Sequence, residues 1–291
     1  MIEVGVALPH LVAGLDRTLF AEWCAGIDEG PFASISAGER ITFQNLEGIT
    51  TCAAAAVLTN RVRVLANVVV LPWHHTPMIA KQLATIDVLC GGRLDVAVGV
   101  GGRGQDYLAL GVSDSGRHER LDVGVAELRR LWSGEPAADG QPVGPSPVQP
   151  GGPQLFASAM GPKSLARAAR WASGISGFSV LADPEEMARL SRAASAAWVA
   201  AGRAERPRLI TGSFVSLGEG AHETLREFAF RYLEVFSAEL ARSLADAMPL
   251  HTQESLAAAL LAAESAGYDE FIVVPATSDP AMLSALADVC R

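Results

Sequence analysis

Apolar and polar positions recur along this chain in blocks that alternate between strand-like and helix-like spacing. The clearest block covers residues 62–102. Residues 62–71 are almost continuously apolar and rich in β-branched side chains, which is typical of a strand buried on both faces. Apolar residues then recur at helical spacing over 77–89, and a second short apolar run follows at 94–98. The block therefore predicts a strand, a helix and a second strand, which form one unit of a parallel sheet.

The same spacing extends over the whole chain. It predicts eight strands, at residues 4–8, 32–36, 62–71, 94–98, 154–157, 175–178, 208–217 and 270–274. It predicts helices near residues 17–29, 45–58, 77–89, 118–132, 162–172, 184–201, 220–266 (interrupted at 248–252) and 279–289. This alternation predicts an α/β protein of the (β/α)8 TIM-barrel type, with a single domain over residues 1–291. An open doubly wound parallel sheet is the alternative.

One segment breaks the alternation. Residues 133–153 read SGEPAADGQPVGPSPVQPGGP, and proline and glycine at this density exclude a helix or a central strand. The strand and helix pattern continues on both sides, so the segment is expected to join the fourth helix to the fifth strand and not to link two domains. A loop of this length in a compact domain is usually functional or disordered.

Charge and cysteine usage exclude several functions. The chain carries 32 acidic and 23 basic side chains, a net charge of −9, which argues against nucleic-acid and anionic-membrane partners. The four cysteines form no CxxC pair and no HExxH spacing occurs, so no metal site is predicted. No apolar run is long enough to span a bilayer, and the chain starts with an apolar strand in place of a charged leader. We therefore expect a cytoplasmic protein.

Glycines follow the fourth predicted strand. Gly99, Gly101 and Gly104 spell GxGxxG, which by itself suggests a dinucleotide-binding turn. The motif lies after the fourth strand and not in a first strand–helix turn, and no second strand ending in an acid follows at the required distance. Gly99, Gly101 and Gly102 are better explained as bare backbone against which a ligand lies at the mouth of a barrel. A tight turn without a ligand is the alternative.

The end of the fifth predicted strand opens a helix at Pro162, a residue that suits the first helical turn. Free backbone N–H groups at a helix start bind phosphate well, and Ser158, Ser164 and Lys163 could add hydrogen bonds or charge. A capped helix start that faces solvent explains the same residues equally well.

Titratable residues follow the first three predicted strands. Glu39 and Arg40 end the second strand, where they could face a ligand or form an exposed ion pair of little energetic value. His10 follows the first strand, and His74 and His75 follow the third. Each histidine could donate a proton near neutral pH, and each could equally be a polar residue at the rim.

A resemblance emerges at residues 80–102, AKQLATIDVLCGGRLDVAVGVGG. This segment resembles the region between the third and fourth strands of the bacterial luciferase-like oxidoreductases, which depend on flavin or on the deazaflavin F420. Their pattern is a helix that begins with proline, a Leu-Asp pair, a Ser-Gly-Gly-Arg turn and a strand with a glycine-rich end. It is matched here by Pro77, Ile86-Asp87, Cys90-Gly91-Gly92-Arg93 and Gly99 to Gly102, with Cys90 in place of the serine.

The resemblance implies a TIM barrel that binds F420 or FMN at the carboxyl ends of its strands. The cofactor ring would lie near the end of the third strand and the glycines of the fourth, at Asn67, Val68, Val69, Gly99, Gly101 and Gly102. The phosphate would be held by the backbone of Ser158, Ala159, Met160 and Gly161, with Ser176, Gly177 and Phe178 on the other side of the cofactor. A homodimer or a higher homo-oligomer is also implied.

One departure from the family bears on catalysis. Members often carry a histidine at the end of the second strand, where this chain has Glu39-Arg40-Ile41, so acid–base chemistry is assigned to Glu39 or His10. The leading hypothesis is an oxidoreductase acting on a small organic substrate. Reduced F420 would transfer hydride, whereas FMNH2 with oxygen would support a monooxygenase. The Ala-, Gly- and Arg-rich composition slightly favours F420, which is common in high-GC actinobacteria. A barrel that binds flavin or another ligand without turnover is the main alternative, and a phosphosugar-type TIM-barrel enzyme ranks last.

Overall fold

The computed structural model describes residues 2–138 and 140–290. Its eight strands are all parallel and close into a barrel in sequence order, with β8 paired to β1. They are β1 Glu3–Ala7, β2 Ser34–Ala37, β3 Arg63–Val70, β4 Leu94–Gly99, β5 Gln154–Ala157, β6 Gly174–Ser176, β7 Arg208–Val215 and β8 Glu270–Pro275. The predicted TIM barrel is therefore confirmed, and the open doubly wound sheet is wrong.

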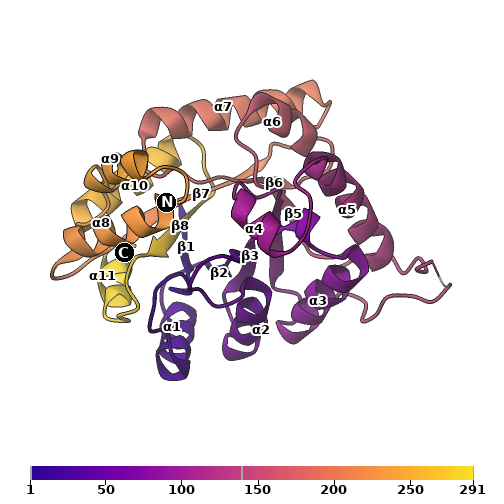
Figure 1. The fold of residues 1–291 in the computed structure, drawn as a ribbon, viewed down its shortest axis with the longest axis horizontal. Coiled ribbons are helices and arrows are strands. Elements are labelled where there is room, and N and C mark those ends of the chain that lie inside the picture. Colours follow the sequence, from indigo (N-terminus) through magenta and orange to yellow (C-terminus); the bar gives the residue numbers. More distant parts are fainter. Residues whose placement is uncertain (1, 139, 291) are drawn as a thin grey trace.

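Helices surround the barrel (Figure 1). They are α1 Arg17–Glu29, α2 Gly48–Leu58, α3 Thr76–Leu89, α4 Gly104–Ala109, α5 Arg117–Trp132, α6 Pro162–Ala168, α7 Pro184–Ala200, α8 Ala221–Leu233, α9 Ala238–Asp246, α10 Gln253–Ser265 and α11 Met282–Val289, with a short 3-10 turn η1 at Leu71–Trp73. None of those in the described part of the chain is both long and apolar enough to cross a membrane.

Two features of this helix set differ from the sequence prediction. Residues 220–266 form three helices and not two, because a further break follows Leu233 and Ser237 begins α9 by accepting a hydrogen bond from the Leu240 amide. Helix α4 lies in a stretch that the sequence analysis left without a helix. Its Tyr107 is buried, and the phenol donates to the carbonyl of Val100 at 2.6 Å, a tertiary contact that glycine-based reasoning does not reveal.

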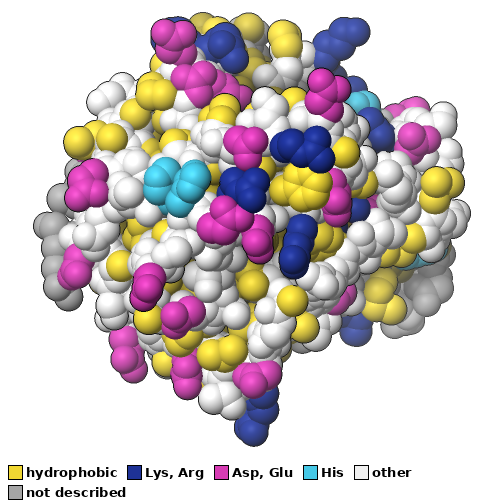
Figure 2. Space-filling view, turned by 60° about the vertical axis from the view of Figure 1, so that its left-hand side comes forward, with side chains coloured by type: hydrophobic (Ala, Val, Ile, Leu, Met, Phe, Trp, Pro, Cys, Tyr) yellow, Lys and Arg dark blue, Asp and Glu magenta, His cyan; other side chains and the backbone are white. Residues whose placement is uncertain are grey.

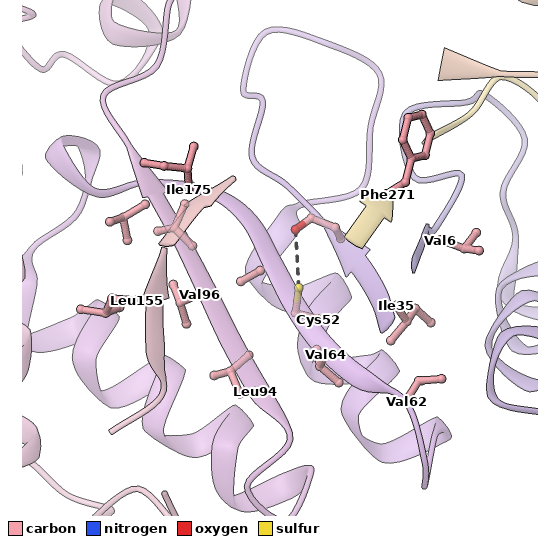
Figure 3. Close-up of a cluster of buried hydrophobic side chains, with 14 of the residues drawn as sticks. Val6, Ile35, Cys52, Val62, Val64, Leu94, Val96, Leu155, Ile175 and Phe271 are labelled. Atoms are coloured by element: carbon pink, nitrogen blue, oxygen red, sulfur yellow. Dashed lines mark hydrogen bonds between the residues drawn. The ribbon is translucent and has the colours of Figure 1, made fainter. Parts of the chain in front are cut away.

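The main core lies between the barrel and its helices. Figure 3 shows outward-facing strand side chains, among them Val6, Ile35 and Val96, packed into one apolar cluster. All three are completely buried. Burying a side chain of this size contributes about 1.5–3 kcal/mol, so this layer dominates the stability of the barrel. Cys52 of α2 belongs to it and places its thiol 3.7 Å from the carbonyl oxygen of Ala37.

The barrel interior is filled in layers. Charged and polar side chains close the amino-terminal end, where Arg208 bonds Glu270 at 3.0 Å and Arg63 pairs with Asp95. Burial raises the pKa of both Glu270 and Asp95. An apolar layer lies above, made of Ala7, Leu65, Ala97, Phe156, Ile210 and Ile272. These two layers fill the lower part of the barrel interior, and a cavity lies above them at the carboxyl ends of the strands.

The turn from α3 to β4 gives the Gly91-Gly92-Arg93 sequence a physical explanation. Gly91 and Gly92 adopt positive φ angles of 65° and 83°, which end the helix. The guanidinium of Arg93 then reaches the carboxyl end of α2. There it donates to the backbone carbonyls of Ala56 (3.3 Å) and Thr59 (2.6 Å), among others. A cation is favourable at this pole of the helix dipole.

The segment between α5 and β5 projects from the barrel at the right of Figure 1. Its described residues form no helix or strand beyond a single bridge between Pro136 and Pro142. Asp87 of α3 holds its carboxyl-terminal part: the buried carboxylate accepts from the amides of Val148 (2.7 Å) and Gln149 (3.0 Å) and from the Gln149 side chain (2.8 Å). One aspartate therefore docks the loop onto the barrel.

Candidate functional site

A cavity of about 350 Å³ opens at the carboxyl ends of the strands, directly above the apolar interior layer. This volume lies within the range of about 300–1,000 Å³ that small-molecule sites occupy. Of the residues predicted for the site, those that line the cavity are His10, Glu39, Asn67, Val68, Ser158, Met160, Ser176 and Gly177. The structure thus gathers, at one opening, residues that lie as much as 167 positions apart in the sequence, from His10 to Gly177.

The predicted glycines after β4 do not line this cavity themselves. Gly99 lies directly behind its wall: a Cβ there would stand 3.0 Å from Val68 Cγ1 and 3.1 Å from Ser158 Cβ. Gly101 has a φ of 64°, and Gly102 is exposed to open space. The glycine run therefore serves the close packing of the wall and the turn into α4, and bare backbone does not form the floor of this cavity.

Val69 also differs from the expectation, because its side chain faces the helices and is buried in the outer core. The register of β3 against β4 shifts between Asn67 and Val69, so the consecutive residues Asn67 and Val68 both line the cavity. The peptide bond between them is cis. Gly38 allows β2 to pass this segment, since a Cβ at Gly38 would lie 2.2 Å from the backbone oxygen of Asn67.

Asn67 and Ser176 connect opposite sides of the barrel. Ser176 Oγ of β6 donates to Asn67 Oδ1 of β3 at 2.8 Å. Because the amide oxygen is used in this way, the amide nitrogen of Asn67 is the group available to donate to a ligand in the cavity. A fixed donor in a mainly apolar cavity orients a planar heterocycle.

Residues 158–161 join β5 to α6. The Ser158 amide continues the sheet by donating to Val98 at 2.9 Å, and Ser164 Oγ accepts from the Gly161 amide at 3.1 Å, so the helix start is capped. Ala159 is buried in the outer core, whereas Met160 is exposed and lines the cavity. Among the described residues the amides of Ala159 and Met160 have no hydrogen-bond partner.

Glu39 lies in the cavity wall and pairs with a histidine and not with its neighbour Arg40. Its side chain is 4% exposed; Oε1 is 2.7 Å from His74 Nε2, and Oε2 accepts from the Val70 amide at 2.7 Å. The predicted possibility of a Glu39–Arg40 ion pair is therefore wrong. A carboxylate and an imidazole in direct contact can hold a proton and pass it on.

His10 has both ring nitrogens engaged. Nδ1 donates to the carbonyl of Leu8 at 2.9 Å, which leaves Nε2 to accept from the Gly38 amide at 3.3 Å. Burial lowers the pKa of His10, so the ring is neutral near pH 7. This geometry suits His10 to fixing the position of Gly38, and it offers no free nitrogen to a substrate.

The outer wall of the cavity is aromatic, and among its residues only Phe178 was expected near the cofactor from the sequence. Phe178 follows β6, Phe214 lies on β7, and Tyr232 and Phe236 lie at the end of α8 and in the following break. Phe214 stands 4.8 Å from Phe178 and 4.9 Å from Tyr232 between ring centroids. The only signal in the sequence was the apolar end of an interrupted helix, which does not show whether that end turns over the barrel mouth.

Comparison with known protein families identifies the family of this chain. The family model described as luciferase-like monooxygenase matches residues 9–260, well over half of the sequence. The chain belongs to this family. The predicted resemblance is thereby confirmed.

Two relatives show the extent of the similarity in sequence. An uncharacterized Mycobacterium tuberculosis protein is 35% identical over 176 residues, which are 57% of this chain and 61% of that protein, so the match spans about three fifths of the relative. An FMNH2-dependent dimethylsulfone monooxygenase from Pseudomonas fluorescens is 32% identical over 101 residues, 34% of this chain and 27% of the relative.

Solved structures agree on the fold. An F420-dependent secondary alcohol dehydrogenase, crystallised with an F420–acetone adduct, superimposes with a TM-score of 0.82 over 99% of this chain and 98% of its own, at 18% identity. At that identity the similarity shows the shared barrel alone.

Proposed function

We propose that this chain is an oxidoreductase that binds a reduced deazaflavin or flavin in the mouth of its barrel and acts on a small organic substrate. The observation that carries the proposal is the single cavity in which Asn67, Ser158 and Ser176 meet. Relatives named for F420 and for FMNH2 support both cofactors. F420, which would transfer hydride, is the first choice; FMN with oxygen is the second.

The residues present fit such a cofactor. Val68, Ile272 and Val274 provide an apolar surface for a planar ring, and the Asn67 amide provides a donor for the ring edge. The unpartnered amides of Ala159 and Met160 provide donors for a phosphate. When bound, the cofactor supplies the hydride, or as FMNH2 the reaction with oxygen; the protein supplies position and exclusion of water.

We assign the proton-handling role to Glu39, because it reaches the cavity and is in contact with His74. The aromatic wall of Phe178, Phe214 and Tyr232 would exclude water from the reacting atoms. His10, with both ring nitrogens engaged, acts as a positioning residue that holds Gly38 against the barrel.

The first test is a binding titration. Purified protein is mixed separately with F420 and with FMN while intrinsic tryptophan fluorescence is followed. Saturable quenching by one of the two identifies the cofactor, and quenching by neither contradicts the proposal.

Turnover then separates an enzyme from a barrel that only binds the cofactor. That alternative is motivated by Glu39-Arg40-Ile41 at the end of β2, where the family resemblance leads us to expect a histidine. Oxidation of the reduced cofactor is followed with small alcohols, ketones and oxygen. Glu39→Gln should lower the rate at least tenfold and leave cofactor affinity unchanged. A protein that binds cofactor but oxidises it with none of these acceptors is the non-catalytic relative.

We also propose that the chain forms a homodimer or higher homo-oligomer. Exposed apolar side chains gather on two neighbouring helices: Val57 and Leu58 on α2, and Met78, Val88 and Leu89 on α3. A second copy that covers this face would remove them from water. Light scattering after size exclusion should give at least twice the mass of the chain, and the double variant Val88→Glu/Leu89→Glu should give a monomer. A monomeric wild type would contradict the proposal.

A further inference from the structure

Arg40 lies in the cavity wall in an unusual setting. Its guanidinium carbon stands 4.0 Å from the ring centroid of Phe43 and 4.1 Å from that of Tyr232, and the residue is 6% exposed. Nη2 donates to the backbone oxygen of Tyr232 at 2.9 Å. Nε and Nη1 are buried and have no hydrogen-bond partner among the described residues.

Among the described residues, no acidic side chain forms an ion pair with this cation. Asp106, whose charge acts on Arg40, is already bonded to Arg103 Nε at 3.1 Å and to the amide and hydroxyl of Thr42. Glu234 is exposed at the end of α8. Arg103 also has a buried Nη1 without a hydrogen-bond partner among the described residues. Its positive charge lowers the pKa of Arg40.

The energetic consequence is that this position favours an anion. A buried hydrogen-bond donor without a partner is unfavourable, and more so when it is charged. Burial of the guanidinium lowers the pKa of Arg40 to about 10, which still leaves it charged at pH 7. Nε–H and the Nη1 hydrogens point to different edges of the group, so an anion would accept a charge-assisted hydrogen bond from one of these edges of the guanidinium. The flanking aromatic rings would fix its plane.

The position of Arg40 separates this anion from the cofactor. Arg40 follows β2, whereas the amides proposed for the cofactor phosphate follow β5, three strands farther round the closed barrel. The carboxyl ends of β2 and β5 open into the same cavity. An anion at Arg40 therefore belongs to the molecule that shares the cavity with the cofactor.

We infer that Arg40 binds an anionic group of the substrate, so that the proposed oxidoreductase acts on small organic acids: carboxylates, sulfonates or phosphate esters. This inference rests on the proposed function, and it adds the substrate class. The negative group would lie between β2 and α8, and the Glu39 carboxylate would lie one residue back in the same wall.

Isosteric pairs test the inference. Calorimetry on the full chain measures the dissociation constants of benzoate against benzamide, hexanoate against hexanamide, and butanesulfonate against butanesulfonamide, with and without cofactor. Wild type should bind at least one acid tenfold more tightly than its neutral partner. Arg40→Met should abolish that preference, Arg40→Lys should keep part of it, and Arg242→Met, on the exposed face of α9, should leave it unchanged.

The outcomes are distinguishable. Equal affinity for acid and amide in all three wild-type pairs overturns the inference, whether or not Arg40→Met folds. Retention of the preference in a folded Arg40→Met does the same. FMN and riboflavin form a further pair: a fall in the FMN preference of Arg40→Met would show that the anion is the phosphate of the cofactor and not of the substrate. Loss of cofactor binding with an intact acid preference would instead contradict the proposed function alone.

Discussion

Replacement of Asp87 by alanine should loosen the 133–153 loop and destabilise the whole barrel. The carboxylate is 0% exposed and accepts three hydrogen bonds, two from backbone amides and one from the side chain of Gln149. A hydrogen bond to a charged group contributes about 1.5–3 kcal/mol. Part of this loss would be recovered, because Val148 is exposed and the freed amides could reach water. We therefore expect Asp87→Ala to lower the free energy of unfolding by about 3 kcal/mol.

The assay is urea unfolding followed by circular dichroism, with hydrogen exchange at the amides of Val148 and Gln149 as a local readout. Asp87→Asn keeps one acceptor oxygen and should cost about half as much. Asp114→Ala is the control, since that carboxylate is 62% exposed and lies 3.9 Å from its partner Arg117. An Asp87→Ala protein within about 0.5 kcal/mol of wild type, or one whose exchange at 148 and 149 is unchanged, would show that the aspartate does not anchor the loop.

Three further predictions concern the barrel and its mouth. Arg93→Ala should cost about 2–3 kcal/mol in thermal or urea unfolding, because the carbonyls at the end of α2 lose their donor, whereas Arg117→Ala, at the partly exposed first residue of α5, should cost less than about 0.5 kcal/mol. Burial lowers the pKa of His10 below its usual 6.5, so the folded state binds this proton more weakly than the unfolded chain does. The free energy of unfolding should therefore be highest above pH 6.5 and fall as the pH drops and the unfolded chain takes up the proton. His10→Asn should flatten this dependence of stability on pH. Gly99→Val should weaken cofactor affinity at least tenfold, because the methyl groups of the valine would press on the cavity wall. Gly104→Val is the control, since its side chain would face open space and should leave the affinity unchanged. Equal cofactor affinities of the two variants would count against a cofactor in this cavity.

The strands were predictable because burial on both faces leaves a direct trace in the sequence. Residues 154–157 were located to the residue, and the glycine pair at 91–92 marked the end of α3. The short helix α4 was not predictable, since three of its flanking residues are glycines and its stability comes from the buried ring of Tyr107. Local spacing therefore predicted the elements that form the barrel and missed the one that depends on a contact made after folding.

The site was predictable where it depends on strand ends and not where it depends on helices. Ser176 ends β6 and Asn67 lies in the carboxyl-terminal half of β3, and the carboxyl ends of parallel strands meet at one opening, so their neighbourhood followed from topology. Tyr232 and Phe236 lie at the end of a helix whose apolar face is compatible with ordinary core packing. The sequence pattern gives the face of such a helix but not the direction in which its last turn leans.

The charge on the surface bears on which ligands the protein attracts. On the face drawn in Figure 2, acidic side chains lie between a few basic ones, and neither sign gathers into a continuous patch. On this face the negative charge is distributed, and the net charge of −9 would repel anionic small molecules from a distance. Any preference for an acid must come from a short-range cation inside the cavity, and Arg40 is in position to provide it.

The pair Glu39–Arg40 shows why adjacency in sequence is a poor guide to chemistry. An adjacent acid and base suggest mutual neutralisation, yet the two side chains diverge: Glu39 turns to His74 beside β3, and Arg40 to Tyr232 at the end of α8. The cavity wall consequently presents a proton-handling group and a cation at separate points. Because the two groups do not bond each other, substrate recognition and proton transfer can be altered independently. On the proposed function, substitution of Arg40 should change KM and the selectivity between acid and amide, whereas substitution of Glu39 should change kcat.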